Sequence, residues 1–125
     1  MAKIKRTLYN TSRPSYAAFK KRHLEMGFDE KTMMSREKFN EMILQPCAYC
    51  GFQPDGKTSW NSVDRIDSWK GYEDDNVVPA CKHCNYTKGS LSVKQLREYF
   101  KRVCEHINKI GLENWPLCEN KKSKN

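Results

Sequence analysis

The sequence lacks any apolar run long enough to span a lipid bilayer, and its basic N-terminus, residues 1–6, lacks the apolar stretch of a signal peptide. These absences argue against a membrane protein and against a secreted one. We therefore expect a soluble protein of the cytoplasm with no membrane partner. With 125 residues and 38% hydrophobic content, it should form one domain whose modest core benefits from a staple.

Acidic residues are also absent from positions 1–22, which hold seven Lys or Arg. The formal net charge of the chain is +8, and the positive excess lies at the two ends. A basic end is typical of a contact with the phosphate backbone of nucleic acid, whose affinity falls as salt rises. A solvated face that keeps the protein in solution explains the same charge equally well.

Turn residues and apolar spacing divide the chain into five predicted segments. These are a basic arm (1–12), a helical region (13–45), a turn-rich region with two short strands (46–92), a C-terminal helix (93–111) and a polar tail (112–125). We expect helices that start near residues 12–14, 35, 82 and 92, and strands near 59–64 and 76–79. The predicted fold class is α+β.

Six cysteines are present, and four of them form two Cys-x-x-Cys pairs: Cys47 with Cys50, and Cys81 with Cys84. Two such turns can bring four thiolates to one tetrahedral zinc ion, which would contribute folding free energy to a small core. Two disulfides, or redox chemistry at one pair, are the alternatives. We expect Cys104 to pack as a small hydrophobe on the last helix, and Cys118 falls in the tail.

A zinc ion that joins these two pairs would enclose the residues between them as two strands followed by a helix. Asp64 would then end the first strand, and Asn85 would lie on the helix. Carboxylate and amide oxygens suit Mg²⁺ or Mn²⁺, and two protein ligands leave positions for water and a phosphate oxygen. The alternative is that Asp64 caps a turn and Asn85 caps the helix.

One combined motif runs through residues 46–92. It consists of Cys47-Ala48-Tyr49-Cys50-Gly51, Asp64-Arg65, Gly71-Tyr72, Asn76 and Cys81-Lys82-His83-Cys84-Asn85-Tyr86-Thr87-Lys88-Gly89. The stretch resembles an HNH endonuclease, a family with the ββα-metal fold, and the helices before "QPCAYCG" are similar to those of small phage and restriction members. The combination is specific, although each piece alone is weak.

The resemblance implies a small ββα-metal core that is stapled by a four-cysteine zinc site and flanked by N- and C-terminal helices. It implies that Asp64 and Asn85 bind a catalytic Mg²⁺ or Mn²⁺, that Asn76 braces the loop, and that Lys88 lies near the DNA backbone. The implied activity is phosphodiester hydrolysis in double-stranded DNA by an endonuclease or nickase. For a phage- or virus-encoded protein the compartment would be the host cytoplasm, and a homodimer stays an open alternative.

Position 65 departs from the family pattern, in which a His after the Asp is the general base. Arg65 stays protonated and cannot accept a proton, but it can pair bidentately with a phosphate and stabilise transition-state charge. A base must then come from elsewhere. Tyr72 and His83 rank ahead of Tyr49, His23 or no protein base, and for each ring packing is the alternative role.

Two other functions fit the same residues. One is a catalytically inactive HNH-fold module that binds nucleic acid, and the other is a zinc-stapled structural or interaction protein. Binding without cleavage would indicate the first, and the absence of salt-dependent affinity would indicate the second. Trp60 and Trp69 flank the first strand, and we expect both to pack in the core or hairpin rather than to stack on a base.

Overall fold

The computed structural model of the chain describes residues 10–116. These residues fall into two compact units, one that ends at Ser92 and one that begins at Val93, and each is described by itself. The first nine residues of the predicted arm and the end of the predicted tail, including Cys118, lie outside the described residues. In the described range no helix is long and apolar enough to cross a membrane. That the whole chain is one domain stays a prediction.

The helical region contains α1 (Tyr16–Glu25), a 3-10 turn (Glu30–Thr32) and α2 (Arg36–Met42). Helix α1 begins slightly later than predicted because the hydroxyl of Ser15 accepts the Ala18 N–H and caps the first turn. Helix α2 begins as predicted, with Ser35 as its cap. Gly27 follows α1 with a φ of +92°, a conformation that glycine adopts without strain.

A two-stranded antiparallel hairpin forms from β1 (Ser62–Arg65) and β2 (Val77–Ala80), with Asp64 opposite Val78. The hairpin was predicted, but the first strand begins later than expected. The reason is that residues 58–61 make their backbone hydrogen bonds elsewhere. The Trp60 N–H donates to the Thr11 hydroxyl at 2.8 Å, and the Asn61 N–H donates to the Ile43 carbonyl at 2.8 Å.

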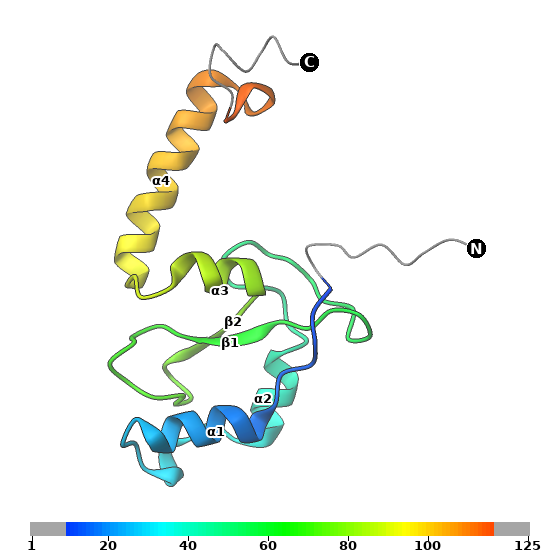
Figure 1. The fold of residues 1–125 in the computed structure, drawn as a ribbon, viewed down its shortest axis with the longest axis vertical. Coiled ribbons are helices and arrows are strands. Elements are labelled where there is room, and N and C mark those ends of the chain that lie inside the picture. Colours follow the sequence, from blue (N-terminus) through cyan, green and yellow to red (C-terminus); the bar gives the residue numbers. More distant parts are fainter. Residues whose placement is uncertain (1–9, 117–125) are drawn as a thin grey trace, which may run out of the picture. The chain divides into compact units, whose positions relative to one another are not determined.

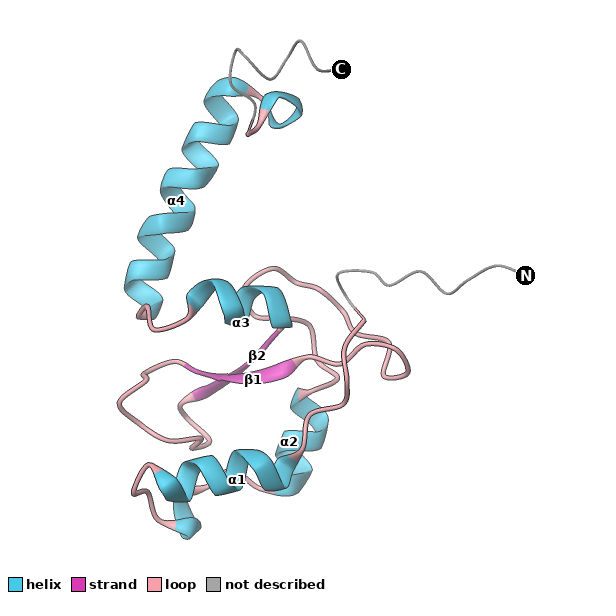
Figure 2. Ribbon diagram, viewed as in Figure 1, coloured by secondary structure: helices cyan, strands magenta, loops and turns pink. Residues whose placement is uncertain are grey.

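Helix α3 (Lys82–Lys88) follows β2 directly and packs against β1, within the span that the sequence predicts. The hairpin lies between α3 on one side and α1 with α2 on the other (Figures 1 and 2). The second unit contains α4 (Val93–Ile110) and a 3-10 turn (Leu112–Asn114), close to the predicted C-terminal helix. The described chain is therefore a small α+β protein with four α-helices and one two-stranded sheet.

The hydrophobic core fills the space between the hairpin and the first two helices. Because side chains alternate along a strand, Val63 faces this core while its neighbours Ser62 and Asp64 face α3. Met34, Phe39 and Ile43 are almost completely buried. The complete cluster is Phe19, Met33, Met34, Phe39, Met42, Ile43, Val63, Tyr72 and Val77.

Trp60 and Trp69 differ in their environment. Trp60 is half-buried and packs against the core, as the sequence analysis expects. Trp69 is 89% exposed, so the prediction that it packs is wrong. The inner side of its loop is already filled, because the Arg65 guanidinium lies 5.4 Å from the centre of the Tyr72 ring and Asn76 occupies the loop interior.

Candidate functional site

The four cysteines that the sequence predicts as zinc ligands come together at the junction of the hairpin and α3. Their sulfurs all lie within 4.8 Å of one another, and the sulfurs of Cys50 and Cys81 are 3.7 Å apart. A tetrahedral zinc with Zn–S bonds near 2.3 Å needs sulfur–sulfur separations of about 3.8 Å. No disulfide involves the described cysteines. The cluster therefore fits a metal ion such as zinc, held by Cys47, Cys50, Cys81 and Cys84.

Backbone donors support the cluster. The Cys47 sulfur accepts the N–H groups of Cys81 at 3.2 Å and Tyr49 at 3.4 Å, and the Cys81 sulfur accepts the Cys84 N–H at 3.3 Å. Burial opposes ionisation of Cys47, but these donors outweigh it and lower the pKa of Cys47 to about 7. Gly51 closes the first turn with a φ of +79°. Cys47 is thus prepared for the thiolate form that a metal requires.

The other thiols behave differently. Burial raises the pKa of Cys50 and of Cys84, and the neighbouring Cys81 adds to the rise for both. A metal ion would reverse this by neutralising the charges that gather there. Cys104 is exposed on α4, so the expectation that it packs is wrong. It lies about 100° around the helix from its apolar neighbour Val103.

Asp64 lies on the face of β1 that is turned toward α3 and is only 8% exposed. One carboxylate oxygen accepts the Tyr49 hydroxyl at 2.6 Å and lies 3.4 Å from the Lys88 ammonium. Burial and the hydrogen bond to Asp64 raise the pKa of Tyr49, so the phenol is held protonated as a donor. The carboxylate is thus held in place from two sides.

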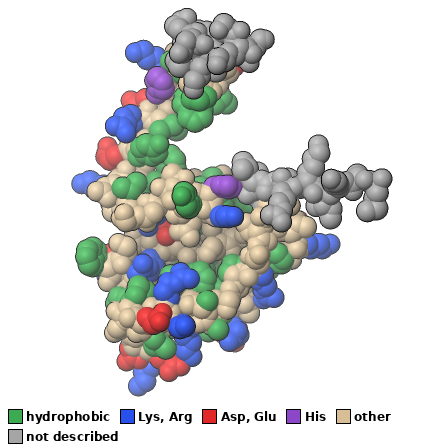
Figure 3. All heavy atoms as spheres, viewed as in Figure 1, with side chains coloured by type: hydrophobic (Ala, Val, Ile, Leu, Met, Phe, Trp, Pro, Cys, Tyr) green, Lys and Arg blue, Asp and Glu red, His purple; other side chains and the backbone are tan. Residues whose placement is uncertain are grey.

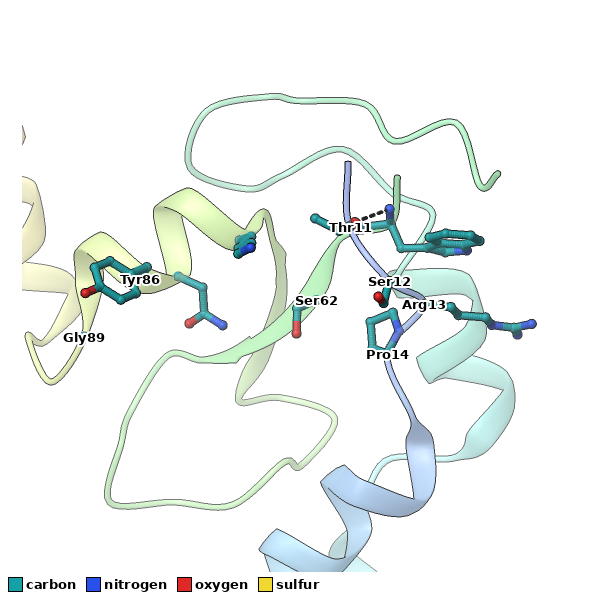
Figure 4. Close-up of a pocket in the computed structure, with 10 residues that line it drawn as sticks. Thr11, Ser12, Arg13, Pro14, Ser62, Tyr86 and Gly89 are labelled. Carbon is teal, nitrogen blue, oxygen red and sulfur yellow. Dashed lines mark hydrogen bonds between the residues drawn. The ribbon is translucent and has the colours of Figure 1, made fainter. Parts of the chain in front are cut away.

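Asn85 lies one helical turn before Lys88, on the same face of α3. It lines a groove of about 730 Å³ together with Ser62, the strand neighbour of Asp64 on that face. Figure 4 shows Ser62 on β1 between Tyr86 of α3 and the segment of residues 11–14. The two predicted ligands of the second metal therefore belong to facing surfaces of β1 and α3, at the edge of an open groove.

Lys88 is 3% exposed, with its ammonium between Asp64 and the Arg65 carbonyl, to which it donates at 3.0 Å. A phosphate contact needs an accessible ammonium. The predicted role at the DNA backbone does not fit this placement, and the structure gives Lys88 the role of a buried counter-ion for Asp64 instead.

Arg65 points to the opposite face of the hairpin from Asp64, as strand alternation requires. Its guanidinium donates to the carbonyls of Ser68 at 2.9 Å and Lys70 at 3.0 Å, and it contacts the Met26 sulfur at 3.2 Å. The structure does not bring Arg65 together with Asp64 and Asn85. The predicted phosphate contact of Arg65 stays a prediction.

The base candidates that rank first in the sequence are not adjacent to Asp64. Tyr72 is 4% exposed in the core, where its hydroxyl accepts a hydrogen bond from Arg22 at 2.9 Å. His83 is exposed on α3, but it lies two positions before Asn85, which places the two side chains on different sides of the helix. Tyr72 therefore has the packing role that was its alternative.

The lower-ranked candidates are also engaged. His23 is fully buried, where its Nδ1 accepts the Tyr72 N–H at 3.0 Å and its Nε2 lies 2.9 Å from the Asp29 carbonyl. Because Nδ1 is an acceptor here, the ring is neutral and ties α1 to the loop. The Tyr49 hydroxyl donates its proton to the hydrogen bond with Asp64, so it is not in the form that accepts a proton. Its place as a partner of Asp64 was not predicted, since nothing in a Cys-x-x-Cys turn indicates a contact 15 residues away.

Asn76 braces the loop between β1 and β2 from inside. Its amide nitrogen donates to the Asp67 carbonyl at 3.0 Å and to the Gly71 carbonyl at 2.9 Å. Its amide oxygen accepts the Asp67 N–H at 2.9 Å, and the side chain is almost fully buried. Asn76 thus braces the loop that joins the two strands, whereas the resemblance implies a loop between strand and helix.

Comparisons with known proteins add little beyond this geometry. No protein-family model matches the chain. An uncharacterized protein of Acanthamoeba polyphaga mimivirus is 33% identical over 87 residues, which cover 69% of this chain and 16% of the viral protein. The chain thus spans about a sixth of the length of that relative, and the relative's name states no activity.

Proposed function

We propose that the chain is a metal-dependent DNA endonuclease or nickase of the HNH type, built on a ββα-metal core. The observation that carries this proposal is the meeting of two surfaces. The β1 face with Asp64 lies against the α3 face with Asn85, next to the four-cysteine cluster and at the edge of the groove. A hairpin, a following helix and a metal staple at their junction are what the resemblance implies.

In this proposal Asp64 and Asn85 hold Mg²⁺ or Mn²⁺ through a carboxylate and an amide oxygen. The cation supplies charge neutralisation at the scissile phosphate and stabilises the leaving oxygen. Tyr49 fixes the orientation of the Asp64 carboxylate through its hydroxyl. The groove offers Lys82 and Arg13 as cations for the phosphate backbone, beside the exposed ring of Tyr86.

Double-stranded DNA is the proposed substrate, because the chain carries +8 and its first 22 residues hold no acid. The viral relative is consistent with a virus-encoded enzyme that acts in the host cytoplasm. A monomer would nick one strand, and a homodimer would cut both.

Supercoiled plasmid incubated with Mg²⁺ or Mn²⁺ tests the proposal. Wild type should convert it to nicked or linear DNA, while Asp64→Asn, which preserves shape and removes the charge, should reduce the rate by at least two orders of magnitude. Asp75→Asn is the matched control, since Asp75 is an exposed acid of the loop that follows β1. Equal cleavage by wild type and Asp64→Asn, with equal zinc content and folding, would overturn the proposal.

One observation favours a second candidate, an inactive HNH-fold module that binds nucleic acid. The buried ammonium of Lys88 lies 3.4 Å from the Asp64 carboxylate, where it supplies the positive charge that a metal would otherwise supply. Such a module would bind the same plasmid or a duplex oligonucleotide in a mobility-shift assay. It would leave the DNA intact in Mg²⁺, Mn²⁺ and other divalent metals.

A further inference from the structure

The loop between β1 and β2 presents Trp69 to solvent. The indole is 89% exposed, the highest value among the large hydrophobic side chains in the described range. Figure 1 shows this loop extending beyond the ends of the two strands. A single exposed ring is not unusual by itself, so its surroundings decide whether it can serve as a contact.

The loop holds Trp69 rigidly. The Arg65 guanidinium donates to the carbonyls on both sides of it, Ser68 at 2.9 Å and Lys70 at 3.0 Å. The Trp69 N–H donates to the Asp67 carboxylate at 2.9 Å, and the Asp67 backbone is bonded in turn to the buried Asn76. The ring is thus presented by a pre-organised backbone, which lowers the entropy lost when a partner binds.

The surroundings of Trp69 are basic in effect. Lys70 follows it, the Arg65 guanidinium is bonded to the carbonyls on both sides of it, and Arg22 of α1 contacts Tyr72 of the same loop. None of these three cations forms an ion pair within residues 10–116. Figure 3 shows Lys and Arg side chains on the lower part of the visible face, where Figure 1 places α1, with Asp or Glu side chains among them.

The acids of the loop are largely engaged. Asp67 accepts the Trp69 N–H, Glu73 accepts the Gly71 N–H at 3.3 Å, and Asp74 pairs with Lys38 at 3.5 Å. The residues on either side of Trp69, Ser68 and Lys70, are polar, and the apolar side chains nearby are only partly exposed, Ile66 at 39% and Met26 at 37%. A single rigid aromatic ring among cations fits a nucleobase beside its phosphates.

We propose that Trp69 is a base-stacking contact to DNA and that Arg65 is the positioning residue that presents it. This inference rests on the proposed function, because it concerns the same substrate, but the contact belongs to the loop after β1 and not to Asp64 or Asn85. It also gives Arg65 a task that a His at this position would not perform, since one guanidinium nitrogen bridges two loop carbonyls.

The test is fluorescence anisotropy with a fluorescein-labelled DNA duplex and its single strand, without Mg²⁺ or Mn²⁺ so that no cleavage occurs. Trp69→Ala should weaken binding about 5- to 150-fold, and Trp69→Phe should recover most of the loss. Leu112→Ala, which removes another exposed apolar side chain, should bind like wild type. DNA should quench tryptophan emission in wild type and much less in Trp69→Phe.

Arg65→Lys should retain the charge but weaken DNA binding and the quenching, because the lysine side chain ends one bond short of the guanidinium nitrogen that bonds both carbonyls. Equal affinity of Trp69→Ala and wild type, without quenching, would overturn the inference. Loss of a dimer in Trp69→Ala, at unchanged DNA affinity, would reassign Trp69 to a protein contact and also overturn it. If DNA quenches the tryptophan emission of wild type but wild type never cleaves DNA, the nuclease proposal fails while the Trp69 inference stands. The failure of one is thus distinguishable from the failure of the other.

Discussion

Asp64 and Lys88 form a buried ion pair, and Tyr49 donates a hydrogen bond to the same carboxylate. Whether Asp64 can bind a cation depends on this pairing with Lys88. The carboxylate is 8% exposed and the ammonium 3% exposed, with 3.4 Å between them. Two buried charges of opposite sign repay their desolvation only as a pair, so the loss of one partner costs more than the pair contributes.

Replacing Lys88 by Met should lower the free energy of unfolding by about 3–5 kcal/mol, because it leaves a buried carboxylate without its counter-ion. Urea unfolding of the zinc-loaded protein measures this. The double variant Asp64→Asn, Lys88→Met should recover much of the loss. A cost below about 1 kcal/mol for Lys88→Met alone would show that the ion pair is not buried as described.

Asp55 contributes to the free energy of unfolding in a way that depends on pH. Its carboxylate accepts the backbone N–H groups of Lys57, Thr58 and Ser59 at 2.8 to 3.0 Å, and these bonds lower the pKa of Asp55 well below its ordinary value. Because the pKa of Asp55 is lower in the folded state than in the unfolded state, its ionised carboxylate stabilises the fold at pH values above the unfolded-state pKa of about 3.9. This stabilisation is lost as the pH falls from there toward the folded-state pKa.

Asp55→Asn should therefore melt at a lower temperature than wild type at pH 7. The difference between the two melting temperatures should become smaller below about pH 4. Thermal melts of both proteins between pH 3 and 7 check this, and taking the difference removes the shared effect of acid on the thiolates. Asp75→Asn should show a small gap that does not change with pH. A constant gap for Asp55→Asn would contradict the assignment.

At the scale of elements, the cysteine cluster fastens the turn at residues 47–50 to the start of α3, across the whole hairpin. Among the described residues the apolar cluster here is small. Cys47, Ala80 and Cys81 are buried, and Tyr49, Phe52 and Cys84 pack against them. A metal here would supply folding free energy that the small core lacks.

Purified protein should contain one zinc per chain, and its removal by a chelator should unfold residues 46–92. Circular dichroism with metal analysis measures both. Cys84→Ser should lose zinc, while Cys104→Ser, an exposed cysteine outside the cluster, should retain it. Unchanged circular dichroism after confirmed metal loss would contradict a structural site.

Local signals predicted the elements well. Ser35, Gly27 and the two Cys-x-x-Cys turns each act on their own neighbourhood, and α2, the end of α1 and α3 lie where these residues place them. Within each Cys-x-x-Cys pair the closeness of the two sulfurs follows from the spacing, whereas the meeting of the two pairs depends on the hairpin that lies between them.

Contacts between distant residues could not be predicted in the same way. The side of the strand that Arg65 faces depends on register, and a shift of one residue would exchange it with Asp64. The exposure of Trp69 depends on Arg65, Tyr72 and Asn76 filling the loop interior first. The pairing of Lys88 with Asp64 depends on how α3 packs on β1.

At the scale of the whole molecule, the proposed nuclease and the proposed inactive module both require DNA binding. The net charge of +8 and the groove beside Asn85 favour such binding. The affinity for a duplex should fall with rising salt, with a logarithmic slope of about −0.9 for each phosphate neutralised. Mobility shifts between low and physiological salt measure the slope. A slope of zero would favour the structural or interaction protein instead.

The proposed nuclease activity depends most on whether Asp64 and Asn85 can share a divalent cation although Lys88 already faces the carboxylate. Titration of the zinc-loaded protein with Mn²⁺, followed by electron paramagnetic resonance, measures this directly. We expect one saturable Mn²⁺ site per chain in wild type, lost in Asp64→Asn and weakened in Asn85→Ala, with Asn108→Ala as the matched control. The absence of saturable Mn²⁺ binding in wild type, with and without DNA, would contradict the account.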